Sequence, residues 1–230
     1  MANDNPLWGA PRIHGEMLKL GFDISEATVQ RYLHKKPRRT TGQPWKTFVK
    51  NHPAEIISLD IFVVPTISFK LLHVLVFLPH DRRRIIHFNV TAHPTAQWSA
   101  QQLRNAFSDE EPPRFLIRDR DTKFGELFTE TVSALGMEAI LTAYRSPWQN
   151  GHCERIIGSI RRECLDHQII MNESHLRRIL QSYFRYYNTQ RTHLEIHKDS
   201  PEPRHVQADG EIDKVAVANG LHHFYFRKAA

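Results

Sequence analysis

Hydrophobic residues follow two patterns along this chain, and the first of them predicts strands. Three apolar runs, EIISLDIFVVP, SFKLLHVLVFLP and RRIIHFNVT, lie within residues 55–91 and are separated by turn-forming or charged residues. Runs of this length that are rich in β-branched and aromatic residues predict strands, here an antiparallel meander. Two shorter strands are predicted at PRFLIRD and MEAILT.

The second pattern has helical spacing and alternates with the later strands. Helices are predicted over TAQWSAQQLRNAF, GELFTETVSALG, residues 151–166 and residues 173–190. A meander followed by alternating helices and strands predicts a mixed sheet flanked by helices. In the last helix, six large residues at helical spacing indicate a face packed on the core rather than a surface for stacking bases. They are Leu176, Ile179, Leu180, Tyr183, Phe184 and Tyr187.

Residues 11–34 predict two further helices joined by a turn at Gly21, with Ser25 as the N-cap of the second. Because the second helix ends in basic residues, the pair indicates a helix-turn-helix segment over residues 1–36, with Gln30 and Arg31 as candidate DNA contacts. A plain helical hairpin is the alternative, and so short a region is expected to be part of a larger DNA-binding region. The residues expected to face inward are Ile13, Met17, Leu20, Val29, Tyr32 and Leu33.

Charge and composition favour a nucleic-acid partner. The net charge is +6, and residues 37–50 are expected to form a basic linker whose charge, including Lys46, follows a phosphate backbone or is simply solvated. With 40% hydrophobic and 24% charged residues, the chain has the composition of a globular protein. No apolar run reaches the length of a membrane span, and neither a signal peptide nor a disulfide framework is indicated, so we expect a cytoplasmic protein that joins the nucleoid when bound to DNA.

Three acidic residues are candidates for chemistry. Asp60 interrupts an apolar strand, where an unpaired carboxylate is costly, although pairing with an arginine is the alternative. Asp119 directly follows a strand, at the end where α/β sheets place ligand sites, whereas Asp121 is better placed to cap the next helix. Glu154 lies near the start of a helix that a capping box at Ser146 is expected to begin, with Asn150 as an alternative start. An ordinary first-turn acid is the alternative interpretation of Glu154. Gathered together, three carboxylates could hold divalent metal ions against a phosphodiester.

The spacing of these acids adds to the argument, because Asp119 and Glu154 are 35 positions apart. Over about residues 50–203 the chain resembles the D,D(35)E catalytic cores of insertion-sequence transposases and retroviral integrases. The run DRDTKF that starts at Asp119 is similar to the family motif Asp-x-Gly-Ser-x-Phe/Tyr, with Asp-Thr in place of Gly-Ser. The run SPWQNG before Glu154 looks like the loop that leads into the family's glutamate helix, and the segment from Tyr187 to Pro201 resembles one that often closes such cores.

The resemblance implies a ribonuclease-H-like fold, an α/β mixed five-stranded sheet flanked by helices. The core would cover residues 51–203, after the small N-terminal helix-turn-helix segment and the linker, and before a C-terminal tail at residues 204–230. It also implies that Asp60, Asp119 and Glu154 are the catalytic residues and the ligands of two Mg²⁺ or Mn²⁺ ions.

The function implied is that of a DNA transposase or integrase, which cuts the ends of a mobile element and joins them to target DNA. Its partners would be DNA and further copies of the chain, with no membrane and no small-molecule substrate. Arg155, Arg161 and Arg162 are candidate contacts to the DNA backbone, or an ordinary solvated helix face. A catalytically inactive DNA-binding remnant and a structure-selective nuclease of the same fold are the alternatives.

Overall fold

The computed structural model describes residues 1, 8–33, 44–81, 84–193 and 196–228, and the chain divides into two compact units, Met1–Pro44 and Trp45–Ala230. Most of the predicted linker, residues 34–43, lies outside the described residues. Each unit has its own apolar cluster, so each is described by itself.

The N-terminal unit contains two short helices, α1 (Ala10–Lys19) and α2 (Glu26–Tyr32). Ser25 is the N-cap of α2, because its hydroxyl accepts a hydrogen bond from the backbone N–H of Thr28 at 3.2 Å. Ile13 and Val29 are buried as predicted, and Met17 and Leu33 pack against them. Leu20 and Tyr32, however, are 62% and 77% exposed, because both lie at helix ends, beyond the short contact between α1 and α2.

The second unit begins with a helix where a linker was predicted. Helix α3 (Trp45–Asn51) is followed by the single turn η1 (Pro53–Glu55). Trp45, Phe48 and Val49 have the i, i+3, i+4 spacing of an amphipathic helix and pack against an apolar cluster that includes Phe115. The predicted linker at residues 37–50 is therefore wrong for residues 45–50. Lys46 lies on the exposed side of α3.

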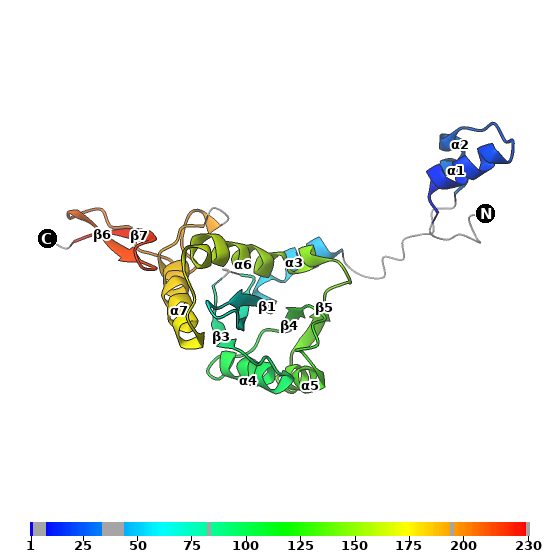
Figure 1. Ribbon diagram of the computed structural model, residues 1–230. Coiled ribbons are helices and arrows are strands. Elements are labelled where there is room, and N and C mark those ends of the chain that lie inside the picture. The colour runs from blue at the N-terminus through cyan, green and yellow to red at the C-terminus, as the bar shows by residue number, and fades with distance from the viewer. Residues whose placement is uncertain (2–7, 34–43, 82–83, 194–195, 229–230) are drawn as a thin grey trace. The chain divides into compact units, whose positions relative to one another are not determined.

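The sheet has five strands in the order β3-β2-β1-β4-β5. The three strands of the predicted meander, β1 (Ile56–Pro65), β2 (Leu71–Pro79) and β3 (His87–Thr91), are antiparallel. The strands β4 (Phe115–Arg118) and β5 (Glu138–Leu141) continue the sheet parallel to β1. The mixed five-stranded sheet predicted from the sequence is thus confirmed (Figure 1).

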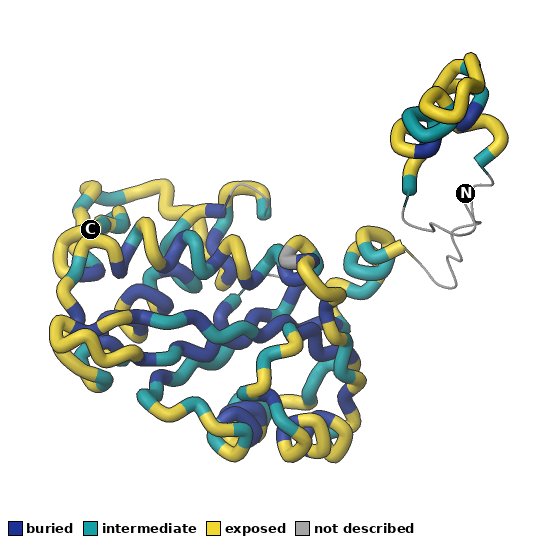
Figure 2. Tube along the Cα trace, turned by 45° about the vertical axis from the view of Figure 1, so that its right-hand side comes forward, coloured by how far each residue is buried: buried dark blue, intermediate teal, exposed yellow. Residues whose placement is uncertain are grey.

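Helices cover both faces of the sheet, with α4 (Ala96–Ala106) and α5 (Glu126–Ala134) on one and α6 (Gly151–Glu163) and α7 (Glu173–Thr189) on the other (Figure 1). Single turns, η2 (Pro147–Asn150) and η3 (Leu165–His167), flank α6. Alternation along β1 sends Ile57 and Leu59 into the α4–α5 core, and Phe62 and Val64 into the α6–α7 core. The whole predicted apolar stripe of α7 is buried, and Figure 2 shows the buried residues concentrated in the sheet and on the inner helix faces.

The predicted C-terminal tail instead contains a hairpin formed by β6 (Ile212–Val217) and β7 (His222–Arg227). Its turn has Ala218, Asn219 and Gly220 at positive φ, and an Asn-Gly pair is a strong signal for such a turn. The hairpin is held to the core by His222, whose Nε2 lies 2.6 Å from the carbonyl oxygen of Glu163 and whose ring stacks on Tyr186. None of the described helices is long and apolar enough to cross a membrane.

Candidate active site

The sheet brings Asp60, on β1, near Asp119, which directly follows β4. Strands β1 and β4 are parallel, and the register pairs Ile57 with Leu116 and Ser58 with Ile117. Continued two residues further, the same register sets Asp60 opposite Asp119, at the carboxyl end of β4. Adjacent strands are about 4.8 Å apart, so these two carboxylates, 59 positions apart in sequence, start from neighbouring backbone positions.

The start of α6 is anchored to the backbone next to Asp60. The side-chain amide of Asn150, which is buried, donates a hydrogen bond to the carbonyl oxygen of Leu59 at 3.1 Å. One turn further along, Glu154 lies exposed in the first turn of α6, while Cys153 and Ile156 are buried below it. This anchor therefore places the predicted glutamate beside the strand that carries the predicted aspartate.

The expected capping box at Ser146 is not formed. Ser146 precedes η2 rather than α6, and its hydroxyl donates to the carbonyl oxygen of Tyr144 at 3.3 Å instead of capping a helix. Asn150, the alternative start, occupies the N-cap position of α6, but its Oδ1 makes no capping hydrogen bond; its side-chain NH2 group donates to the Leu59 carbonyl oxygen instead. Asn150 therefore anchors the start of α6 to a distant strand and does not cap the helix.

The three predicted acids influence one another electrostatically. Burial of the half-buried Asp60 raises its pKa from 3.8 to about 7, the negative charge of Asp119 adds to the rise, and the charges of Glu154 and Asp121 contribute less. A hydrogen bond from the Ile61 N–H to Asp60 Oδ1, at 2.7 Å, opposes the shift. Among the described residues no arginine pairs with Asp60, so the alternative of a simple arginine pair is not supported.

Asp121 has a different role from its neighbour Asp119. Its carboxylate pairs with Lys123 Nζ at 2.6 Å and accepts the Lys123 N–H at 2.9 Å, while its own N–H donates to Asp119 Oδ1 at 3.2 Å. Burial opposes ionisation of Asp121, but the hydrogen bonds and charge of Lys123 outweigh it and lower the pKa of this carboxyl. The predicted helix cap is wrong, because α5 begins after Gly125 without a side-chain cap; Asp121 instead closes the turn that presents Asp119.

Arg118 braces the same turn from the inside of the sheet. It is only 6% exposed, and it donates to the carbonyl oxygen of Asp119 at 3.2 Å and to Thr129 Oγ1 at 3.1 Å. Its guanidinium also lies over the rings of Phe124 and Phe128. Burial lowers the pKa of Arg118, which the Asp119 charge partly offsets. Arg118 was not predicted as a site residue, although an arginine at the end of the apolar strand FLIR is visible in the sequence.

The oxygen donors match the chemistry of Mg²⁺ or Mn²⁺, and the charge repulsion that helps to raise the pKa of Asp60 is what a bound divalent cation relieves. In the part of the chain that the structure describes, no group of three or more His, Cys, Asp or Glu side chains is already arranged to hold a metal ion. The three carboxylates therefore suit such an ion by the chemistry of their oxygen donors, and their charges influence one another, but their side chains are not arranged as a ready metal site.

The basic residues predicted to contact DNA are exposed, but they are not all in one place. Arg155, Arg161 and Arg162 lie on α6 together with Glu154, and Arg161 donates to the carbonyl oxygen of Val63 at 3.2 Å. Lys46 is exposed on α3 of the same unit. The N-terminal unit carries the remaining two predicted contacts exposed on α2, namely Gln30 and Arg31.

Two exposed aromatic residues in the loop before α6 were not predicted as site residues. Tyr144 is 81% exposed and Trp148 is 68% exposed. The guanidinium of Arg120 lies 4.7 Å from the centre of the Tyr144 ring, and its Nε donates to the carbonyl oxygen of Thr142. Large exposed aromatic side chains beside basic ones suit contact with nucleic-acid bases. Trp148 is part of the run SPWQNG, which was interpreted only as the start of a helix and as a family motif.

Comparisons with known proteins bear on the fold of the second unit. Residues 135–201 match the model of the Integrase core domain family. The simian T-cell lymphotropic virus intasome in complex with PP2A regulatory subunit B56 gamma is similar in fold, with 13% identity over 96% of this chain and 87% of that chain and a TM-score of 0.54. A search of curated proteins finds no match.

Two further solved structures have TM-scores of 0.49. The catalytic domain of the Mos1 mariner transposase is 16% identical over 60% of this chain and 74% of that chain. The catalytic core domain of BIV integrase is 14% identical over 64% of this chain and 91% of that chain. Structures of the Mos1 catalytic domain with raltegravir contain Mg or Mn.

The strand order and the flanking helices define a ribonuclease-H-like fold, as in integrase and transposase catalytic cores. Residues 135–201 match the Integrase core domain model, in agreement with the resemblance seen in the sequence.

Proposed function

We propose that the chain is a DDE polynucleotidyl transferase that cuts DNA ends and joins them to target DNA, with Asp60, Asp119 and Glu154 as its catalytic residues. The observation that supports this most is the bond by which Asn150 anchors the start of α6, and with it Glu154, to the strand that carries Asp60. The raised pKa of Asp60, caused first by burial and then by the charges of Asp119 and Glu154, agrees with it. Three acids contributed by β1, the end of β4 and the start of α6 share one neighbourhood although no local sequence pattern links them.

The same three carboxylates would hold Mg²⁺ or Mn²⁺, with two ions as the proposed number. Such ions, when bound, activate a water or a 3′-hydroxyl and stabilise the leaving oxygen. Asp60 lies on a central strand, and the hydrogen bond from the Ile61 N–H orients its carboxylate, so it would be the metal ligand with a fixed position. Asp119 is held by the turn that Arg118 and Asp121 brace, and Glu154 is the movable member. Because cutting and joining are both phosphoryl transfers, one site serves both steps.

The DNA backbone would be held by the exposed basic residues Lys46, Arg155, Arg161 and Arg162, giving salt-sensitive binding with little sequence preference. The N-terminal unit, with Gln30 and Arg31, is proposed as a separate DNA reader. Copies of the chain would assemble on the two ends of one element, since one core carries one site.

The test is a strand-transfer assay with labelled end oligonucleotides and Mn²⁺ or Mg²⁺. The expected result is joined product from the unaltered chain and loss of both cutting and joining in Asp119→Asn and Glu154→Gln. Glu130→Gln is the matched control, because it removes an exposed carboxylate on α5 that has no part in the proposed site, and it should keep the activity of the unaltered chain. Full activity in Asp119→Asn or Glu154→Gln would falsify the assignment.

A catalytically inactive DNA-binding remnant is the second candidate, and the absence of a ready metal arrangement among the described residues favours it. It predicts DNA binding without cutting in either metal. The third candidate, a structure-selective nuclease, predicts cutting without joining. The strand-transfer assay separates all three, because it reports binding, cleavage and joining on the same oligonucleotides.

A further inference from the structure

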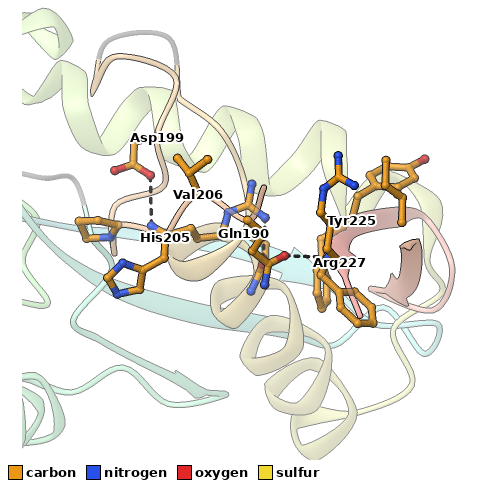
Figure 3. Close-up of a pocket in the computed structure, with 12 residues that line it drawn as sticks. Gln190, Asp199, His205, Val206, Tyr225 and Arg227 are labelled. Carbon is orange, nitrogen blue, oxygen red and sulfur yellow. Dashed lines mark hydrogen bonds between the residues drawn. The ribbon is translucent and has the colours of Figure 1, made fainter. Parts of the chain in front are cut away.

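Two adjoining cavities lie beside the C-terminal hairpin, and neither is lined by Asp60, Asp119 or Glu154. One, of about 630 Å³, lies between β7, the end of α7 and residues 199–207, and Figure 3 shows Gln190, His205 and Arg227 around it. The other, of about 780 Å³, lies between α7 and the hairpin. Gln190 and Phe224 line both cavities, so together they form one groove, which we call the hairpin groove.

Positive charge dominates the hairpin groove. Arg178 and Arg185 line the α7 side, and Arg204 and Arg227 line the other cavity. The one acidic residue that lines the groove is Asp199, and its Oδ1 accepts hydrogen bonds from the backbone N–H groups of Ser200 and Arg204. Four guanidinium groups facing one carboxylate favour a polyanionic ligand.

The guanidinium groups keep donors available for such a ligand. Arg178 and Arg185 are seven residues apart on α7, which puts them on one side of the helix and about 10 Å apart along its axis. Within the described residues, neither side chain has a hydrogen bond or ion pair. Arg204 uses one N–H on Gln190 and Arg227 uses one on the Gly210 carbonyl oxygen, out of five on each guanidinium.

Aromatic side chains and cavity size narrow the ligand class. Tyr225, on β7, is 62% exposed and lines the groove together with Phe224 and Phe226. Exposed aromatic rings next to arginines bind unpaired bases by stacking while the arginines contact phosphates. Both cavities have the size of small-molecule sites, which suits single nucleotides of a strand rather than the cross-section of a duplex.

We propose that the hairpin groove binds single-stranded DNA, with Arg178, Arg185, Arg204 and Arg227 contacting phosphates and Tyr225 stacking on a base. The choice of DNA rests on the proposed function, but strand binding here needs no catalysis and no metal. The groove would give the unit a strand-binding surface in addition to the three acids, so that an unpaired strand at a DNA end has a place to lie.

The test measures binding of the full chain to a fluorescein-labelled oligo-dT strand by anisotropy in EDTA, over a range of salt concentrations. The double variant Arg178→Ala/Arg185→Ala is expected to weaken binding about tenfold or more and to reduce the salt slope by about 1.4, because each lost phosphate contact on a single strand accounts for roughly 0.7. Tyr225→Ala is expected to weaken binding about fivefold or more. Lys70→Ala/Lys214→Ala removes two exposed charges outside the groove and is the matched control, with an unchanged slope.

Wild-type affinity and salt slope in the arginine double variant would overturn the proposal, and so would tighter binding to a duplex of the same sequence. Crosslinking with an iododeoxyuridine strand provides a second readout, in which adducts on β7 support the groove and adducts confined to α6 contradict it. Strand binding that depends on Arg178 and Arg185 but comes without strand transfer would reject the proposed enzyme and keep the groove.

Discussion

Replacing Asp60 by asparagine is expected to make the folded protein more stable at pH 8 while abolishing its metal-dependent activity. In the folded protein the pKa of Asp60 is about 7, raised from 3.8 by burial and by the charges of Asp119 and Glu154. The folded state therefore holds this proton more tightly than the unfolded state does. Stability falls as the pH rises from about 4 to about 7, and the loss is complete above that range.

The size of the effect follows from the shift. A rise from 3.8 to about 7 corresponds to at most about 4 kcal/mol, and solvent screening of a half-buried carboxylate reduces this to roughly 2 kcal/mol. Asparagine is neutral at every pH and keeps an oxygen that can accept the Ile61 N–H. The substitution therefore removes the charge penalty without creating a cavity.

The assay is urea denaturation of both proteins in EDTA at pH 5 and pH 8. Asp60→Asn should be more stable by roughly 2 kcal/mol at pH 8, and the difference should shrink towards pH 5. Asp121→Asn is the control, and it should make the folded protein less stable at pH 8, because the ion pair with Lys123 stabilises the charged form of Asp121. A difference for Asp60→Asn that is absent at pH 8, or that does not vary with pH, refutes the reasoning.

Three other substitutions test how the site is held. Asn150→Ala should cost about 1–3 kcal/mol in urea denaturation, because the buried Leu59 carbonyl loses its partner, and it should lower strand transfer; an unchanged midpoint contradicts the anchor. Arg118→Lys should lower kcat for strand transfer and leave KM nearly unchanged, because the turn that presents Asp119 loses its guanidinium partner. A kcat equal to that of the unaltered chain argues against this role. Burial opposes ionisation of Glu163, but its hydrogen bonds and ion pair with Arg191 outweigh burial and lower its pKa from 4.5. The ionised Glu163 therefore stabilises the folded protein above that pH, and this stabilisation is lost as the pH falls through the lowered pKa. Glu163→Gln should therefore flatten the acid limb of thermal denaturation, and an unchanged limb rejects the link.

Much of the fold could be predicted because its signals are local. The apolar runs predicted the five strands of the sheet, and helical spacing identified the buried stripe of α7. The predictions failed where elements end or where tertiary contacts decide. Leu20 and Tyr32 fit a helical face in sequence, yet both lie at helix ends with no neighbour to cover them.

The site shows the same division between local and long-range information. The spacing of Asp119 and Glu154 pointed to the acids, and Asp60 stood out because a carboxylate interrupts an apolar strand. The contacts that hold these acids in place could not be predicted from residues nearby in sequence. Asn150 reaches a carbonyl 91 positions away, and Arg118 is useful only because Thr129 and the turn after Asp119 fold back onto it. The hairpin was missed although Asn219-Gly220 marks its turn.

The most direct test of the central claim is an anomalous difference map from crystals of the full chain grown with Mn²⁺. The account predicts a peak that contacts carboxylate oxygens of both Asp60 and Asp119, with Glu154 turned towards it, and loss of that peak in Asp60→Asn. A map without manganese density between these residues, in crystals where the acids are ordered and accessible, would contradict it.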